Sequence, residues 1–361
     1  MWFFKKRKPA FLIIPPSPRF PGSGGDEAIV LSAMDLLKMK GGAAEIHLAA
    51  AEPAHPGWHF AAAEKIRLIR LASLNAATLR KYQRVYWFGA DTADGAFGVQ
   101  GALDRCAYLN AAAAAGVPAK LTNFSFREKV EAPILQQMRR FYEQGVSLSL
   151  RDKLSLDRFS KAVGVPADFA ADIAFLLKPG PVPVNILRWI ENHKKQGRKV
   201  VGINPHGFAP ALLAGLINAS TQTAFIFIPH DNRKNYDEAG LIKTLCGRLT
   251  LNPDYFLALE FLNARALRGL CAHLDMVITG RMHLAVAAFS QWVPPVGREY
   301  NAKFRGLYQL FGAEELLLLN ENPNALQDLM SKVLTDAGFK IKIAARLDEV
   351  KASALNHLDL P

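Results

Sequence analysis

The chain has 361 residues, of which half are hydrophobic and 21% are charged, so it can bury sizeable cores and lacks the composition of a disordered protein. This length exceeds the size at which a single hydrophobic core usually stops growing, which predicts two domains. Lysine and arginine outnumber aspartate and glutamate by 44 to 32, and the net charge of +12 favours anionic partners without identifying them.

The N-terminus has aromatic residues at 2–4 and a basic cluster at 5–8, a combination that could contact a membrane surface. The apolar run at 11–14 is too short for the core of a signal peptide and leads into prolines. The three cysteines are far apart and have no metal-ligand or redox spacing, so we expect reduced thiols. These features predict a cytoplasmic protein that could lie at the inner face of the membrane.

In the first half of the chain, short apolar runs alternate with segments of helical spacing, which is the pattern of a parallel sheet with crossover helices. The predicted strands are residues 11–15, 46–50, 85–88 and 146–150. A glycine-rich turn at 21–25 leads from the first of them into a predicted helix at 26–37. The third is followed by the loop Gly89-Ala-Asp-Thr-Ala-Asp-Gly95 and an alanine-rich helix that ends at Gly116, since glycine commonly follows a helix end.

The proline-rich segment at 178–183 cannot continue a helix or a central strand, so we place a domain boundary there. Apolar runs beyond it predict a second sheet. Its predicted strands are residues 199–203, 225–228, 255–259, 276–278 and 292–296. Two C-terminal helices are predicted at 324–337 and 341–358.

The most informative segment, residues 275–290, is a predicted strand that ends at Gly280 and opens into an apolar helix. The first turn of a helix has unpaired N–H groups, and ligands gather at the carboxyl ends of strands in open α/β sheets, so this turn suits an anion. Arg281 and His283 point the same way in an extended backbone. Arginine can bind a carboxylate or phosphate, and histidine can bind phosphate or transfer a proton. A surface arginine beside a buried, hydrogen-bonded histidine is the alternative.

Four segments, in one order, resemble the polysaccharide pyruvyl transferase family. The C-terminal one is Ile278-Thr-Gly-Arg-Met-His283 with Val293-Pro-Pro-Val-Gly297 and Tyr300-Asn-Ala-Lys-Phe304 after it. Gly24-Gly-Asp-Glu-Ala-Ile29 is similar to the family's glycine-rich Gly-Asp-Glu turn. Ser149-Leu-Arg-Asp-Lys-Leu-Ser155 resembles the family's central Ser-x-Arg-Asp segment. Asp172-Ile-Ala-Phe175 resembles the Asp-containing start of the strand that follows that segment in the family.

The resemblance implies an α/β fold of two Rossmann-like domains that face a cleft, a GT-B-like arrangement. Residues 1–180 would form the acceptor side, and residues 181–361, with the C-terminal helices, the phosphoenolpyruvate side. The implied activity is transfer of the enolpyruvyl unit of phosphoenolpyruvate to a sugar or glycan as a pyruvate ketal. Phosphoenolpyruvate would be the donor substrate, and no other cofactor and no metal would be needed.

The resemblance also assigns residues to the donor. Arg281 and His283 would hold phosphoenolpyruvate, and Arg151 would contribute from the central segment unless it forms a structural bridge with Asp152. Lys303 is a further candidate, because a ligand with a carboxylate and a phosphate needs several cations to offset its desolvation.

Gly24 and Gly25 are the glycines of the substrate-binding turn. Ketal formation needs an acid for the methylene carbon and a base for the sugar hydroxyls. His283 is the candidate acid, and Asp26 and Glu27 are candidates for contacting the acceptor. Acidic residues that begin a helix are often only caps, which is the alternative for both carboxylates.

The sequence departs from the family in two places, and these leave the acceptor undefined. Ser23 stands where asparagine is common, and the loop at 89–95 replaces a glycine triplet. Asp91 and Asp94 of this loop could bind a sugar or could bond to their own backbone, as aspartate in a tight turn often does.

Other signals are weaker. His206 and His230 each follow a proline at the end of a predicted strand and could line the cleft or lie exposed. His55 and His59 flank a Pro-Gly pair, so we do not expect them to bind a metal. No P-loop, dinucleotide fingerprint or nucleic-acid-binding motif is present. A GT-B glycosyltransferase that uses a nucleotide sugar, or a non-catalytic glycan-binding relative, would share this fold, and the fold alone does not choose between them.

Overall fold

The computed structural model describes residues 10–17, 20–42, 44–50, 57–233, 236–299 and 303–359, and of residues 57–59 it describes only the backbone. The predicted membrane contact at residues 2–8 lies outside these ranges, as do His55, the His59 side chain and the first part of the segment 300–304. Among the helices within the described ranges, none combines the length and the apolar composition that a membrane span requires.

The chain forms two compact units, and α1 and α14 each have residues in both of them. Unit 1 comprises Met1–Pro21, Ile29–Ile173 and Ser353–Pro361. Unit 2 comprises Gly22–Ala28 and Ala174–Ala352. The main boundary between the units follows residue 173. Residues 22–28 lie within the sequence of unit 1 but belong to unit 2, and residues 353–361 follow unit 2 in the sequence but belong to unit 1.

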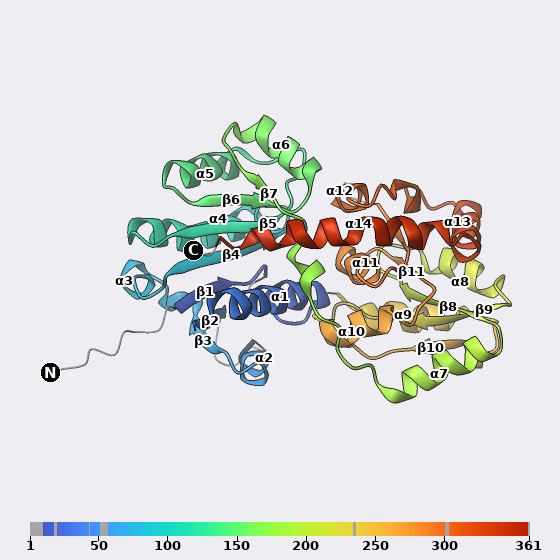
Figure 1. Ribbon diagram of the computed structural model, residues 1–361. Helices are drawn as coiled ribbons and strands as arrows, with labels where there is room; N and C mark the ends of the chain where they lie inside the picture. The colour runs from blue at the N-terminus through green and yellow to red at the C-terminus, as the bar shows by residue number, and fades with distance from the viewer. Residues whose placement is uncertain are drawn as a thin grey trace. The chain divides into compact units, whose positions relative to one another are not determined.

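Unit 1 is built on a seven-stranded, wholly parallel sheet in the order β3-β2-β1-β4-β5-β6-β7 (Figure 1). Its strands are Ala10–Ile14 (β1), Glu45–Ala50 (β2), Arg67–Arg70 (β3), Arg84–Ala90 (β4), Ala119–Phe124 (β5), Ser147–Leu150 (β6) and Asp168–Phe169 (β7). Its helices are α1 (Gly24–Gly41), α2 (Gly57–Ala63), α3 (Ala76–Leu79), α4 (Val99–Ala114), α5 (Ala132–Glu143) and α6 (Lys153–Val163). The four strands predicted for this half are present, whereas β3, β5 and β7 are additional.

Central strand β5 was missed because it carries Lys120, Thr122 and Asn123, all of them buried. Polar side chains in a central strand are tolerated only with partners. The C-terminal residues 353–359 supply two of these: Lys120 Nζ lies 2.9 Å from Asp359 Oδ1, and Thr122 Oγ1 lies 2.8 Å from His357 Nδ1.

Unit 2 has a six-stranded parallel sheet in the order β10-β9-β8-β11-β12-β13. Its strands are Lys199–Asn204 (β8), Thr223–Phe227 (β9), Phe256–Ala258 (β10), Met276–Thr279 (β11), Pro295–Arg298 (β12) and Leu317–Leu318 (β13). Its helices are α7 (Val184–Lys195), α8 (Pro210–Asn218), α9 (Glu238–Cys246), α10 (Ala264–Cys271), α11 (Met282–Phe289), α12 (Lys303–Gln309), α13 (Pro323–Thr335) and α14 (Gly338–Ala354).

Two local expectations were wrong. The strand predicted from residue 292 begins later, because Trp292 has a φ of 57°, which places it in a turn after α11. Residues 172–175 were expected as the start of a strand, but residues from 173 on form the short 3₁₀ helix η2 (Ile173–Leu176).

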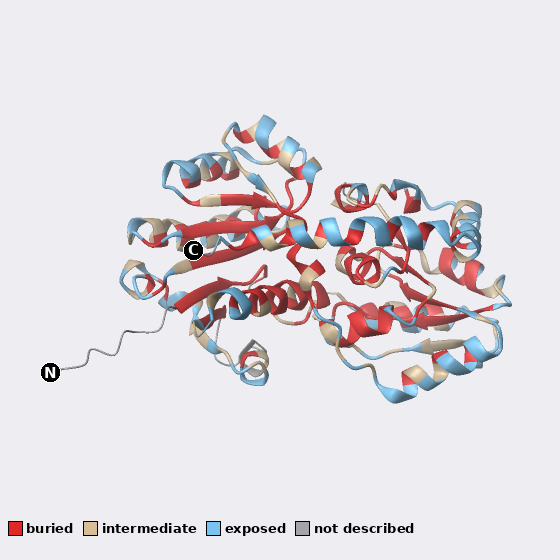
Figure 2. Cartoon of the chain, in the orientation of Figure 1, coloured by how far each residue is buried: buried red, intermediate tan, exposed pale blue. Residues whose placement is uncertain are grey.

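Each sheet forms the core of its own unit. The central strands are buried along their whole length, as in β1 and β9, because helices cover both faces of a parallel sheet (Figure 2). In unit 2, the chain passes from β8 to β9 on one side, while β11 lies on the other side of β8. Neighbouring strands that leave in opposite directions create the crevice in which α/β proteins commonly bind ligands. Asn204 and Thr279 face each other at the carboxyl ends of β8 and β11, which puts that crevice at the predicted Arg281 segment.

Candidate functional site

The turn between β11 and α11 is held tightly against the loop after β8. A Cβ atom on Gly280 would collide with the carbonyl oxygen of His206, so only glycine allows the two loops to approach this closely. The next residue, Arg281, is the N-cap of α11 in an extended conformation, and its N–H donates to Thr279 Oγ1 at 2.8 Å. The sequence therefore places an arginine at the positive end of a helix, as predicted.

Buried and half-buried side chains of unit 2 orient the guanidinium of Arg281. Its Nε donates to Glu238 Oε1 at 2.5 Å, and its Nη2 lies 3.8 Å from Asp231 Oδ2. It also lies over the ring of Tyr236, 5.0 Å from the ring centroid. Nη2 is buried and makes no hydrogen bond. The side chain is 15% exposed. Arg281 thus has a fixed orientation, and the N–H groups of Nη2 are not used in hydrogen bonds.

Glu238, the first residue of α9, is a central residue that the sequence reasoning missed. Its carboxylate is 1% exposed and also accepts hydrogen bonds from Asn204 Nδ2 at 2.8 Å and from the N–H groups of His230 at 2.6 Å and Asp231 at 3.1 Å. It joins the loops that follow β8, β9 and β11. Its position at the start of a helical segment was compatible with a simple cap, and only the fold reveals its partners.

The start of α1 packs against two histidines of unit 2. The N–H of Gly24 donates to the carbonyl of His230 at 2.9 Å, and Ser23 bridges to Asp231. A Cβ atom on Gly24 would lie 3.2 Å from His230 Nε2, and one on Gly25 would collide with His283 Nδ1. The two glycines predicted to bind substrate therefore make room for the two histidine rings.

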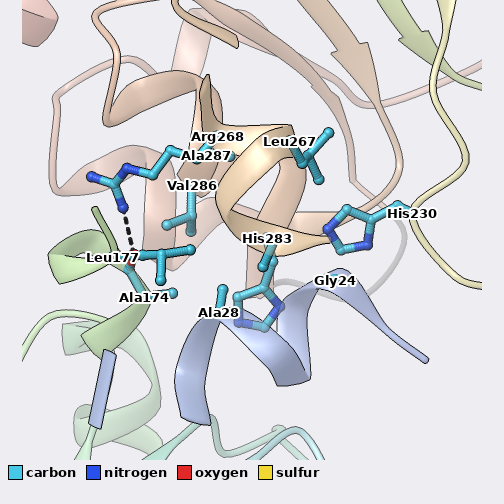
Figure 3. A pocket seen from close by; sticks show the side chains of 11 residues that line it. Gly24, Ala28, Ala174, Leu177, His230, Leu267, Arg268, His283, Val286 and Ala287 are labelled. Atoms are coloured by element: carbon cyan, nitrogen blue, oxygen red, sulfur yellow. Dashed lines mark hydrogen bonds between the residues drawn. The ribbon is translucent and has the colours of Figure 1, made fainter. Parts of the chain in front are cut away.

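These groups line a pocket within unit 2 (Figure 3). Its lining residues are Gly24, Ala28, Ala174, Leu177, His230, Ala264, Leu267, Arg268, His283, Val286 and Ala287. Figure 3 shows the rings of His230 and His283 beside the first turn of α1. About 10 Å³ is accessible to the centre of a water molecule, which is room for about one water. A larger ligand requires side chains to move.

A third histidine, His206, completes the crevice. Burial, followed by the charge of Arg281 and then that of Lys303, lowers the pKa of His206 to about 4. Lys303 is the first residue of α12, and its charge acts on His206. Arg281, His283 and Lys303, predicted for the donor side, all lie in unit 2, and so do Gly24 and Gly25, which the predicted boundary had placed on the acceptor side.

The two acidic candidates of α1 have structural partners. Glu27 is 7% exposed, and its Oε2 accepts a hydrogen bond from the N–H of Ala264 at 3.2 Å, which caps α10. Asp26 Oδ2 lies 3.6 Å from Arg233 Nη1. Both contacts are structural, but neither of them caps α1, the helix that Asp26 and Glu27 begin.

Arg151 lies in unit 1 and is 3% exposed. Its Nε donates to Ser125 Oγ at 2.8 Å and its Nη1 to Asp172 Oδ2 at 3.1 Å. The bridge considered from sequence had the neighbouring Asp152 as its partner, but Asp152 instead caps α6 by accepting from the N–H of Ser155 at 2.7 Å. The partner of Arg151 is Asp172, from the fourth family-like segment.

The loop of unit 1 that was considered for sugar binding contains one buried aspartate. Asp94 is 3% exposed and accepts from the N–H groups of Ala96 at 3.1 Å and Arg127 at 3.0 Å. Burial raises its pKa, and these two hydrogen bonds oppose the increase. Asp94 therefore stabilises its own loop, whereas Asp91 is half-buried.

Within the described ranges, no group of three or more histidine, cysteine, aspartate or glutamate side chains could hold a metal ion. Cys106 and Cys271 are buried, and burial raises the pKa of each thiol to about 12. Such thiols are poor nucleophiles at neutral pH.

The family model described as polysaccharide pyruvyl transferase matches residues 24–301 of the chain. The matched region includes the glycine turn, Arg151, Glu238 and the Arg281 segment. No curated protein sequence matched the chain.

Solved structures share the fold at low sequence identity. A protein from Listeria monocytogenes described as a UDP-N-acetylglucosamine 2-epimerase matches with a TM-score of 0.66 and 12% sequence identity. The match covers 97% of this chain and 94% of the Listeria chain. The Staphylococcus aureus protein MnaA, solved with UDP, has a TM-score of 0.63 and 12% sequence identity, and the match covers 98% of this chain and 93% of the MnaA chain. A Neisseria meningitidis UDP-GlcNAc 2-epimerase, bound to UDP-GlcNAc, has a TM-score of 0.61 and 10% sequence identity, and the match covers 96% of this chain and 97% of the epimerase chain. These likenesses confirm the predicted α/β fold of the GT-B class.

Proposed function

Because this chain belongs to the polysaccharide pyruvyl transferase family, we propose that it transfers the enolpyruvyl unit of phosphoenolpyruvate to a sugar as a pyruvate ketal and releases phosphate. The family and the fold support a transferase. The observation that carries the finer proposal is the buried Nη2 of Arg281, which lacks a hydrogen-bond partner at the crevice between β8 and β11. A buried donor without a partner is costly unless a ligand uses it.

The donor pocket follows from the groups around this atom. Arg281 presents its fork at the N-terminus of α11, where a carboxylate or phosphate is favoured. Lys303 adds a second cation, and His206 adds a neutral ring that can donate to an oxygen. His283, next to the same turn, is the proposed acid for the methylene carbon.

We assign Glu27, Arg151 and Asp94 to the structure rather than to substrate, because their charged atoms are already bonded to buried partners. Asp26 and Asp91 remain candidates for contacting the acceptor, and unit 1 remains the proposed acceptor side. The acceptor itself is proposed only as a sugar with two hydroxyl groups that can close a ketal ring.

The nearest alternative is a glycosyltransferase that uses a nucleotide sugar, since two of the structural neighbours were solved with UDP or UDP-GlcNAc. A thermal-shift comparison of phosphoenolpyruvate, UDP and UDP-sugars separates the two. A ligand that binds only the folded protein raises its melting temperature by mass action. We expect a rise with phosphoenolpyruvate that Arg281→Ala removes. A rise with UDP ligands alone would favour the glycosyltransferase, and no rise with either class would favour a non-catalytic relative.

A further inference from the structure

The fixed charges around Arg281 nearly cancel before any donor binds. Arg233 contacts the carboxylates of Asp26 and Asp231. Arg281 contacts the carboxylates of Asp231 and Glu238. Lys303 adds one further cation nearby. Phosphoenolpyruvate carries about three negative charges when fully ionised, and burying that charge needs compensating positive charge. Arg268, which lines the pocket and donates to the carbonyls of Ala174 and Phe175, supplies one more fixed positive charge. Histidines that gain protons can supply the rest.

His230 is held rigidly by its backbone and has an unused ring nitrogen. Its N–H donates to Glu238 Oε2 at 2.6 Å, and its carbonyl accepts from Gly24 at 2.9 Å. The residue is 3% exposed, yet its Nδ1 is buried and makes no hydrogen bond. An orphaned polar atom at a fixed position beside a pocket indicates a ligand or a proton-transfer role.

His230 shares the pocket with His283, although the two come from different elements. His230 follows β9, and His283 lies in the first turn of α11. The absence of a side chain at Gly24 and at Gly25 gives each ring its space. A group bound between the two rings could therefore exchange protons with both.

The reaction itself needs two proton donations and two proton acceptances. One proton adds to the methylene carbon, and one leaves with the phosphate. Each of the two sugar hydroxyls loses one when its oxygen bonds to the central carbon. Each half of the reaction thus has one donation and one acceptance, and the two rings that line the pocket allow each half to have its own acid–base residue.

Resting on the proposed function, we propose that His230 is a second acid–base residue of this site, which protonates the departing phosphate and then takes the proton of the second sugar hydroxyl. In the first half, His283 gives its proton to the methylene carbon, the first hydroxyl oxygen bonds to the central carbon, and His283 takes that hydroxyl's proton. In the second half, the bond from carbon to the phosphate oxygen breaks and His230 protonates that oxygen. The second hydroxyl then closes the ketal and returns a proton to His230.

This scheme requires His230 to gain a proton when donor binds. In the free protein, burial, followed by the charges of Arg281 and His283, holds the pKa of His230 well below its usual range. Asp231 opposes this shift and Arg233 adds to it, while Glu238 contacts the backbone of His230. A trianion bound at Arg281 adds a larger charge of the opposite sign and favours the protonated ring.

Proton uptake during binding tests the assignment without any acceptor. Phosphoenolpyruvate is titrated calorimetrically at about pH 8, where free histidine and the phosphate group are largely deprotonated, in buffers of different ionisation enthalpy. Wild-type protein should take up protons as donor binds. His230→Asn and His230→Gln should each take up about one proton fewer per bound phosphoenolpyruvate, since neither side chain can be protonated.

His193→Asn is the matched control, because His193 is also buried in unit 2 with an unbonded Nδ1 but bonds to the carbonyl of Asp254 at 2.9 Å. It should leave proton uptake unchanged, and thermal unfolding of each variant reports whether it is folded. Equal uptake by the wild type and a folded His230 variant would overturn this inference, as would donor binding by the wild type without uptake. In both cases the proposed function stands. Wild-type protein that does not bind phosphoenolpyruvate would overturn both.

Discussion

Arg151 in unit 1 and Arg281 in unit 2 occupy equivalent places, and the fold uses them differently. Each follows the last residues of a parallel strand and precedes a helix. Arg151 is 3% exposed and bonded through Nε and Nη1 to Ser125 and Asp172. Arg281 is more exposed, is held through Nε by Glu238, and keeps Nη2 without a hydrogen bond. An arginine after a strand is therefore informative about function only when its donors remain available.

The largest expected effect is on donor binding by Arg281. Arg281→Ala should abolish phosphoenolpyruvate binding, and Arg281→Lys should fail too, because a point charge cannot replace a planar fork held by Glu238. Calorimetry measures the affinity, and thermal unfolding should show that both proteins remain folded, with a lower melting temperature for Arg281→Ala because Glu238 stays buried without this cation. Unchanged affinity in both variants would contradict the assigned role.

The next effect separates binding from chemistry at His283. His283→Asn keeps a hydrogen-bond donor but cannot deliver a proton, so donor should still bind while turnover falls by roughly 10²–10⁴-fold. Donor affinity is measured calorimetrically and turnover as phosphate release in the presence of a sugar acceptor. Near-normal turnover would leave His283 as a phosphate ligand only.

Arg151 should show the opposite pattern, with loss of stability. Arg151→Ala leaves the Asp172 carboxylate buried without its cation, which should cost about 3–5 kcal/mol in chemical denaturation. Arg140→Ala, which removes an exposed arginine of the same unit, should change stability by less than about 0.5 kcal/mol. A stable Arg151→Ala protein that has lost donor affinity would instead make Arg151 a ligand.

The smallest effect concerns His357, whose ring is fully bonded in unit 1. Nε2 donates to the carbonyl of Ala171 at 2.8 Å, so Nδ1 accepts from the hydroxyl of Thr122. Burial lowers the pKa of His357 to about 4, from the ordinary 6.5. Because the pKa of this histidine is lower in the folded than in the unfolded chain, the unfolded chain takes up the proton first on acidification. The free energy of unfolding should therefore decrease by at most about 3 kcal/mol as the pH falls from about 6.5 towards 4.

Denaturation of the wild type and of His357→Gln across this pH range measures the effect as a difference between the two slopes. The variant should lose less stability on acidification, since glutamine has no proton to gain. Parallel curves would show that protonation of His357 is not linked to unfolding of unit 1.

The same comparison shows what sequence patterns could reveal. Apolar runs identified the strands whose side chains are apolar, and the strand-to-helix turn at Gly280 identified Arg281. Strand β5 was hidden because the partners of Lys120 and Thr122 come from residues 353–359. Glu238 was missed for a related reason, since its role depends on three loops that meet only in the folded sheet. Long-range pairing of polar groups leaves no periodic signal in a sequence.

The docking of residues 353–359 against β5 also orders events during protein synthesis. Residues 174–352 of unit 2 are translated between the sheet of unit 1 and the segment that neutralises its buried Lys120. Domains generally fold in order as the ribosome makes them. Unit 1 of this chain is an exception: its sheet emerges first, but its last ion pair forms only after unit 2 has been translated. A ribosome that stalls within unit 2 therefore holds a first unit with an unneutralised lysine in its central strand.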